Sequence, residues 1–489
     1  MNQHYLLALD IGTTSAKAVI FTHDGSVIAA VEEMITSHYP QTGWVEQDPD
    51  AIEKSSINAI RDVIKKANID QTALTALGFS SAMHSLICVD ANGKPLSRAL
   101  IWSDRRSQQQ ADNLKQTHNA LYDRTGLPLH PMSPLTKLLW MKETNYQPYI
   151  DATYFMSIKE YIIYKWFGKR LTDHAMAAAT GMYNAKTNTW DEEALDICNV
   201  KQTQLSTIVS PTTQLPPINK QVAHTMGISP KLPCIIGSAD GQLANLGSGA
   251  ILPGEVAVSM GTSGALRQMV NTHLVSPNQQ TFCCAFTEEQ AIIGGATNNG
   301  GITVRWLKDL LKCDDNFDAF IGLADTVKPG ADGLYFHPYI NGERAPLWQP
   351  DAKGNFFGIR ITHKRAHFVR AVLEGITFNL YHINQTLEQI AGPSEKLYVN
   401  GGLARSDTWV HMLANIFNRP VYVSESHHSA AWGAAWTAHI ATNKTKTFTD
   451  IKANIPIKKI IQPDKNEADM YQEIYQSYYE LATVLADYF

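Results

Sequence analysis

Two short turns rich in glycine, threonine and serine contain the residues best suited to phosphate chemistry. The first, Asp10-Ile-Gly-Thr-Thr-Ser15, follows an apolar run, and the second is Gly261-Thr-Ser-Gly264. Backbone N–H groups and hydroxyls in such turns can surround phosphate oxygens, and the Asp10 carboxylate can hold Mg²⁺ through water. Taken singly, each turn also fits an ordinary hairpin. Together they could clamp a triphosphate between two parts of the chain.

Asp240 offers a second kind of chemistry. It follows the apolar run 234–236 within Ser238-Ala-Asp-Gly241 and can therefore face a cleft between two domains. Phosphate transfer to a hydroxyl needs a group that accepts the hydroxyl proton, and a positioned carboxylate can do this. The alternative is that Asp240 caps a helix that begins near Gly241.

The elements that must position these residues form two similar sets. In the first half, strands are predicted over 5–9, 16–22, from 27, 74–79 and 85–89, with a helix from Pro49 that is capped by Asp48. In the second half, strands are predicted over 255–260, 265–270 and 396–400, with helices after Gly301, over 364–391 and over 406–417. The repeat of strand, polar turn and strand indicates an α/β chain of two similar domains, 1–252 and 253–489. Any two such units look alike, so duplication remains a hypothesis at this point.

Composition excludes several classes of protein. The 489 residues contain 41 Lys and Arg against 46 Asp and Glu, a net charge of −5, which argues against broad binding of nucleic acid. No apolar stretch approaches the ~18 residues of a membrane span, and the first residues lack the features of a signal peptide. The six scattered cysteines form no CxxC pair and fit reduced thiols. We expect a cytoplasmic protein with no nucleic acid or membrane partner. The protein could form a homodimer, which the sequence does not decide.

The two turns, together with Gly401-Gly-Leu-Ala-Arg-Ser406, resemble the FGGY family of carbohydrate kinases over nearly the whole chain. Segments 132–141 and 354–374 are similar to the family's two domain signatures, and Gly342-Glu-Arg-Ala-Pro346 to a further motif. Thr144 departs from the family's usual acid, amide or histidine. The resemblance implies an α/β, two-domain, duplicated ribonuclease H-like ATPase fold, shared with actin, hexokinase and the heat-shock ATPases, with ATP and sugar in the inter-domain cleft.

The resemblance also implies roles for individual residues. Asp240 would be the catalytic base and contact the substrate, and Asp10 would organise Mg²⁺, so that ATP and Mg²⁺ are the expected cofactors. The nucleotide would be bound by Thr13, Thr14, Ser15, Gly261, Thr262, Gly301, Gly402 and Ser406. Ser406 stands where an asparagine is often found. The sugar would be bound by Met83, His84, Trp102, Asp104 and Arg106. A lone histidine such as His84 also fits a satisfied core residue.

Within the family, segments 80–85, 124–134, 158–161 and 401–409 are most similar to gluconate kinases. This likeness implies ATP-dependent phosphorylation of D-gluconate to 6-phospho-D-gluconate. The alternatives are a xylulose kinase or other pentulose or polyol kinase and, outside sugar kinases, a non-catalytic ATP-dependent switch of the actin type. The switch proteins lack the Met-His, Trp-x-Asp-x-Arg and Gly-Glu-Arg-Ala-Pro segments.

A sugar acid adds one requirement to the site. Its carboxylate needs a cation, and the planar fork of arginine suits it best. The candidates in the sequence are Arg105, Arg106, Lys137 and Lys159, and the sequence cannot rank them.

Overall fold

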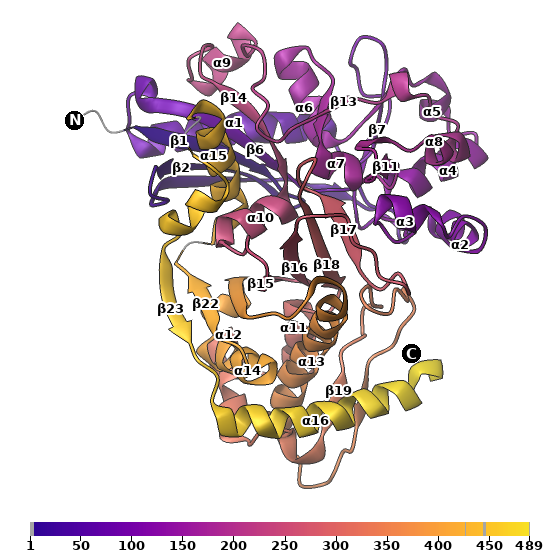
Figure 1. Cartoon of the computed structure of the whole chain (residues 1–489), viewed down its shortest axis with the longest axis vertical. Helices are drawn as coiled ribbons and strands as arrows, with labels where there is room; N and C mark the ends of the chain where they lie inside the picture. Colours follow the sequence, from indigo (N-terminus) through magenta and orange to yellow (C-terminus); the bar gives the residue numbers. More distant parts are fainter. Residues whose placement is uncertain (1–3, 426, 444–445, 489) are drawn as a thin grey trace.

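The computed structural model in Figure 1 describes residues 4–425, 427–443 and 446–488, which are built around two β-sheets. The first sheet has the strand order β14-β6-β1-β2-β3. Its strands are β1 (Tyr5–Ile11), β2 (Ser15–Thr22), β3 (Val27–Met34), β6 (Leu74–Ser81) and β14 (Cys234–Ala239). β2 runs antiparallel to β1 and β3, whereas β6 is parallel to β1 and β14.

The second sheet repeats the first. Its order is β17-β18-β16-β15-β21-β22-β23. The strands are β15 (Glu255–Met260), β16 (Gly264–Val270), β17 (Phe282–Ala285), β18 (Ala291–Thr297), β21 (Lys396–Gly401), β22 (Val421–Ser424) and β23 (Ile457–Ile461). Without the edge strands β17 and β23, the series β18-β16-β15-β21-β22 matches β3-β2-β1-β6-β14 in order and direction. The predicted duplication is thus confirmed.

The helices occupy matching places in the two halves. α1 (Pro49–Ala67) precedes β6, and α13 (Arg365–Ala391) precedes β21. Six more α-helices of the described chain lie outside the insertion of the first half: α10 (Asp240–Ser248), α11 (Gly301–Leu310), α12 (Phe317–Gly322), α14 (Asp407–Phe417), α15 (Ser429–Thr442) and α16 (Lys465–Val484). Between β7 (Ile87–Val89) and β14, the first half inserts α2 (Gln108–Thr117), α3 (Leu121–Thr125), α4 (Pro134–Glu143), α5 (Gln147–Asp151), α6 (Ile158–Phe167), α7 (His174–Ala178), α8 (Glu192–Cys198) and α9 (Lys220–Met226).

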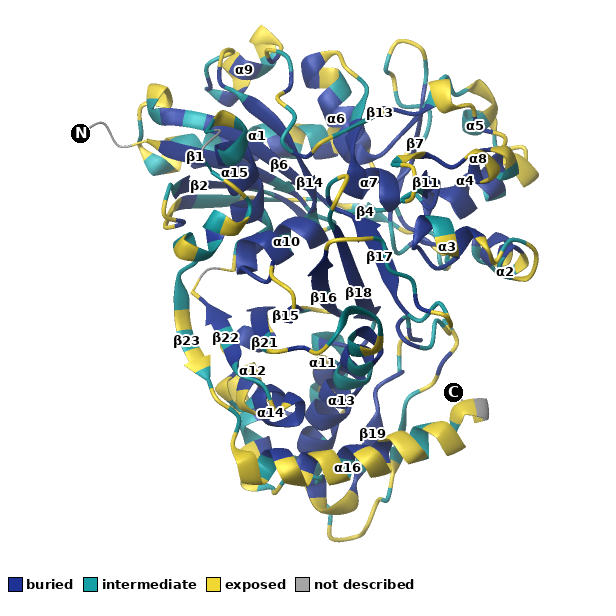
Figure 2. Cartoon of the chain, viewed as in Figure 1, coloured by how far each residue is buried: buried dark blue, intermediate teal, exposed yellow. Residues whose placement is uncertain are grey.

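Local sequence signals explain where α1 begins and which side it buries. Asp48 is its N-cap and accepts from the backbone N–H groups of Asp50 and Ala51, and proline follows at the first helical position. Ile52 and Val63 lie on its buried stripe. Figure 2 shows the inner strands of both sheets as buried, whereas the edge strand β23 is partly exposed. Of the helices in the described residues, none is long and apolar enough to cross a membrane.

α15 crosses between the two halves. It follows β22 in the chain, yet it packs on β1 and β6 of the first sheet and against α10 (Figure 1). Glycines allow this close approach: a Cβ at Gly78 would lie 2.1 Å from the carbonyl oxygen of Ala434, and one at Gly433 would lie 2.1 Å from that of Leu243. A cut near residue 252 therefore does not follow the packing of α15, and the division into 1–252 and 253–489 stays a prediction.

Candidate active site

A cleft of about 300 Å³ lies between the two halves of the molecule, and both glycine-rich turns border it. The first half lines it with Thr13, Ala82, Met83, His84, Trp102, Met132 and Asp240. The second half lines it with Ser259, residues 261–265, Arg267, Ala296 and Arg344. The structure thus brings together residues that lie more than 300 positions apart in the sequence.

The first turn connects β1 to β2 and is held by side chains of the first half of the molecule. The indole Nε1 of Trp102 donates to the hydroxyl of Thr13 (3.0 Å), and the Gln47 amide donates to the Thr13 carbonyl oxygen (2.6 Å). Thr14 is exposed. Ser15 is buried, and its hydroxyl donates to the Glu32 carboxylate on β3. The predicted phosphate role of the Ser15 hydroxyl is therefore not supported, because that group is used within the sheet.

The second turn connects β15 to β16 and is braced by two neighbouring glycines. The N–H of Gly301, at the start of α11, donates to the carbonyl oxygen of Gly261 (2.8 Å). The N–H of Gly402 donates to the carbonyl oxygen of Met260 (2.5 Å). Gly261 and Thr262 are exposed, and a Cβ at Gly261 would meet nothing within 4 Å. The turn therefore presents open backbone to a ligand.

Ser406 has a local structural role. It is the N-cap of α14, and its hydroxyl oxygen accepts from the backbone N–H of Trp409 (3.3 Å). Its side chain is buried, and it is not among the residues that line the cleft. A contact with adenosine stays a prediction for Ser406, as it does for Gly301 and Gly402.

Asp240 lies at the start of α10, on the first-half side of the cleft. Ala239 occupies the N-cap position, and one oxygen of Asp240 accepts from the adjacent N–H of Gly241 (2.7 Å). Burial, together with the nearby Asp10, raises the pKa of Asp240 to about 6, and Arg267 opposes that rise. The capping alternative is not supported, because Asp240 is the first helical residue and Ala239 occupies the N-cap position without a side-chain cap.

Asp10 is the second acid of the cleft region. It accepts from the hydroxyl of Ser80 (2.7 Å), and burial raises its pKa. In the described part of the chain, no group of three or more His, Cys, Asp or Glu could hold a metal ion. Mg²⁺ in kinase sites is commonly held by one or two carboxylates together with substrate phosphates. Asp10 can supply one carboxylate of that donor set.

His84 is prepared to accept a hydrogen bond. Its Nδ1 lies 2.7 Å from the carbonyl oxygen of Ala179, which can only accept, so Nδ1 has the proton. Burial lowers the pKa of His84 to about 3, so the ring is neutral and Nε2 keeps its lone pair. The backbone of His84 has a φ of 69°, and its carbonyl oxygen accepts from the Lys137 ammonium (2.7 Å). These contacts fix both the ring and the backbone of His84 at the wall of the cleft.

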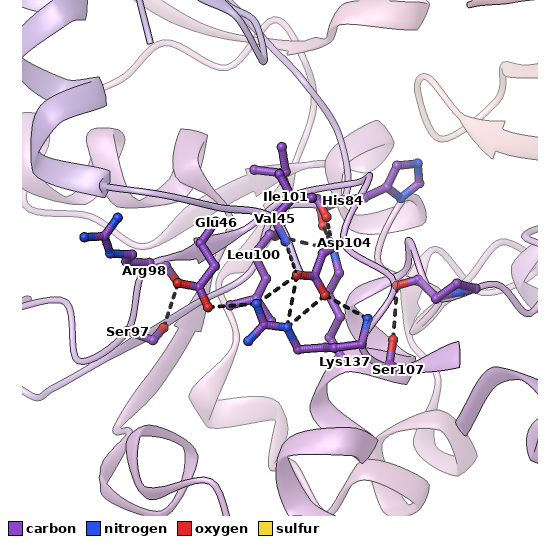
Figure 3. Close-up of polar contacts among 12 residues, drawn as sticks. Val45, Glu46, His84, Ser97, Arg98, Leu100, Ile101, Asp104, Ser107 and Lys137 are labelled. Atoms are coloured by element: carbon purple, nitrogen blue, oxygen red, sulfur yellow. Dashed lines mark hydrogen bonds and ion pairs between the residues drawn. The ribbon is translucent and has the colours of Figure 1, made fainter. Parts of the chain in front are cut away.

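Asp104 and Arg106 are not among the residues that line the cleft in the described part of the chain, and their contact with sugar stays a prediction. The carboxylate of Asp104 is fully buried and accepts from the N–H of Val45 (2.7 Å) and from the Arg106 guanidinium (2.8 Å). Arg106 also pairs with Glu46 (2.7 Å) and lies 3.9 Å from the centroid of the Trp44 ring. Figure 3 shows this buried network around Asp104. Apart from one Arg106 nitrogen that has no partner among the described residues, the polar groups of this network bond one another, so the network positions the surrounding segments.

The four cations that the sequence suggested for the substrate carboxylate all have other partners in the structure. The ammonium of Lys137 donates to the carbonyl oxygens of His84, Leu100 and Ile101 (Figure 3), and that of Lys159 pairs with Asp173 (2.7 Å). Arg105 is exposed and reaches the carbonyl oxygen of Pro350 (3.3 Å). None of the four, Arg106 included, is among the cleft-lining residues of the described chain.

Among the cleft-lining residues that sequence reasoning missed, two are charged, Arg267 and Arg344. Each had a signal. Arg267 is the one charged residue within the otherwise apolar and polar strand β16, whose predicted range contained it. Arg344 belongs to the Gly342-Glu-Arg-Ala-Pro346 segment that was used only as a family motif. A buried cation needs an anion or hydrogen-bond acceptor nearby, and the sequence does not show which group serves Arg267 or Arg344.

Two sheets of the same strand order, each with a glycine-rich turn at a shared cleft, define the duplicated two-domain ATPase fold of the actin and hexokinase type. Residues 5–247 match the model of the FGGY family of carbohydrate kinases, N-terminal domain, and residues 256–442 match that of its C-terminal domain. The chain therefore belongs to the FGGY family of carbohydrate kinases.

Within this family, the chain is similar to kinases of gluconate and of xylulose. The chain is 40% identical to the gluconokinase of Bacillus licheniformis, with 98% of this chain and 96% of that protein covered. It superposes with a TM-score of 0.95 on the crystal structure of a gluconate kinase from Lactobacillus acidophilus at 34% identity, covering 99% of this chain and 98% of that one. A structure from the same organism, described as a ligand-bound xylulose kinase, matches with the same values.

Proposed function

We propose that this kinase transfers the γ-phosphoryl group of ATP to D-gluconate and produces 6-phospho-D-gluconate and ADP. The observation that carries the proposal is the position of Asp240, a carboxylate with a pKa of about 6 in a cleft bordered by both glycine-rich turns. The similarity to gluconokinases supports the choice of substrate.

The reaction needs one proton acceptor. The oxygen of the sugar's 6-hydroxyl forms a bond to the γ-phosphorus while the bond from phosphorus to the β–γ bridging oxygen breaks, and ADP leaves with that electron pair. The hydroxyl proton moves to the carboxylate of Asp240. A pKa near 6 suits this task, since the group is mostly ionised at neutral pH and still basic enough to accept the proton.

The remaining roles follow from the lining of the cleft. The hydroxyl of Thr13 and the exposed turn at Gly261 and Thr262 would bind phosphate oxygens from opposite sides. Asp10 would hold the Mg²⁺ that accompanies ATP, and the ion supplies neutralisation of phosphate charge when it is bound. His84 Nε2 would accept from a sugar hydroxyl. Because Trp102 donates to Thr13, the sugar pocket and the first phosphate turn are directly connected.

A coupled assay of ADP release tests this proposal. We expect kcat/KM for D-gluconate to exceed the values for D-xylulose, D-ribulose and glycerol. A preference for xylulose would assign the chain to pentulose phosphorylation, which the similarity to the ligand-bound xylulose kinase makes the second candidate. Absence of sugar-dependent ADP release with every acceptor would refute the proposal.

A further inference from the structure

Two arginines from the second half of the molecule face the cleft with their guanidinium groups only partly engaged. Arg267 comes from β16, and Arg344 comes from the loop between β19 (Tyr335–His337) and β20 (Asn355–Phe357). One nitrogen of Arg267 lies 3.4 Å from the hydroxyl oxygen of Ser259, and one nitrogen of Arg344 donates to the carbonyl oxygen of Thr297 (3.2 Å). Each arginine is therefore held in place by a neutral group.

The Nε atoms of both arginines are buried and have no hydrogen-bond partner among the described residues. Over the same residues, no salt bridge joins either guanidinium to a carboxylate, in contrast to the buried pairs of Arg106 and Arg370. Glu343 lies beside Arg344 in the chain, yet its side chain accepts from the neutral groups of Thr297, Asn299 and Asn379.

The two charges also act on each other. Burial lowers the pKa of Arg344 to about 10, a shift that the charge of Glu343 opposes and the charge of Arg267 increases. Burial also lowers the pKa of Arg267, and the charge of Asp240 opposes that shift. Leaving buried cations without an anionic partner is costly, and proteins normally pair them. A negatively charged ligand that binds between the arginines would offset the free-energy cost of burying their charges.

The position of the arginines indicates which part of a ligand they meet. The guanidinium carbon of Arg344 lies 5.4 Å from the centroid of the Trp102 ring, and its charge also acts on His84. Both residues belong to the expected sugar pocket. Arg267 lies nearer Asp240: a Cβ at Gly241 would be 3.0 Å from its Nε. The two arginines therefore border the sugar side of the cleft.

We propose that the guanidinium groups of Arg267 and Arg344 together bind the carboxylate of the sugar acid. This inference rests on the proposed function. Arg267 and Arg344 were not among the four cations that the sequence suggested for this role. A planar guanidinium can present two N–H groups to the two oxygens of a carboxylate, which makes arginine the suited cation. Because the pocket belongs to the first half and the arginines to the second, the bound carboxylate connects the two halves.

D-Glucitol is the matched probe, since it has a CH₂OH group where gluconate has the carboxylate. We expect wild-type protein to bind gluconate at least about 100-fold more tightly than glucitol by calorimetry in the presence of ADP. In Arg267→Gln and in Arg344→Gln, gluconate affinity and kcat/KM should each fall about 100-fold, while KM for ATP changes less than about threefold. Arg105→Gln, an exposed arginine outside the cleft, is the control and should change neither.

Other outcomes would overturn the inference. Unchanged gluconate affinity in both Gln variants would exclude the arginine site, and a raised KM for ATP with normal gluconate affinity would assign the arginines to phosphate. If a Gln variant does not fold, the Lys variant at that position decides: it keeps the charge but loses the fork, so we expect a loss of about tenfold. A wild-type protein without gluconate turnover would refute the proposed function, whereas turnover that survives both substitutions refutes only the arginine site.

Discussion

Asp240→Asn is the substitution that tests the mechanism most directly. Asparagine keeps the size of the side chain and can still accept from the N–H of Gly241, but it cannot take the hydroxyl proton. A positioned general base contributes about 10²–10⁴ in rate, or roughly 3–5 kcal/mol of barrier. We therefore expect turnover to fall at least about a hundredfold, with little change in KM for ATP, because the two turns that border the cleft are untouched.

The same substitution has an expected effect on stability. The pKa of Asp240 is raised from its ordinary 3.8 to about 6 in the folded protein, so the ionised form is disfavoured by folding. For an acid with a raised pKa, this cost is absent below pH 3.8 and complete above pH 6, where it is on the order of 3 kcal/mol. Removing the charge at pH 7.5 should thus leave the melting temperature unchanged or higher.

Turnover and melting temperature measured on the same preparation separate the possible roles. Loss of rate with retained or increased stability supports a catalytic base. A lowered melting temperature would indicate a structural role for the carboxylate. Near-normal turnover in a well-folded Asp240→Asn protein would refute the catalytic assignment.

Three further outcomes are expected. The value of kcat/KM for gluconate should rise with pH through about 6 and level off above it, since only ionised Asp240 accepts the proton; a profile that is flat between pH 5 and 8 would contradict this. Asp104→Asn should lower the free energy of unfolding in urea by about 3 kcal/mol because it weakens a buried pair with Arg106, whereas Asp112→Asn at an exposed pair should cost less than about 1 kcal/mol. ATP with gluconate should reduce the radius of gyration in small-angle scattering, and an unchanged radius would argue against closure of the cleft.

Local signals in the sequence predicted most of the fold. Asp48 followed by proline marks the start of α1, and the predicted helix over 364–391 differs from α13 by one residue. The two glycine-rich turns were found because they follow apolar strands directly. These features depend on neighbouring residues, so a single chain segment contains the whole signal.

The path of α15 could not be predicted in the same way. Residues 429–442 are almost uniformly apolar or small, so they have no face that distinguishes one sheet from the other. The helix packs on the first sheet because glycines at 78 and 433 allow close contact with it and with α10. Such complementarity exists only between segments that are far apart in the chain.

Residue types and their order established which groups are available for chemistry: two glycine-rich turns, the carboxylate of Asp240 and several cations. Packing between distant segments sets which of these groups meet. Asp104 and Arg106 satisfy each other within a buried network, while Arg267 and Arg344 approach from separate segments and face the cleft. The physical reason is that the partner of a buried charge is set by packing, whereas residue type and spacing describe only the charge itself.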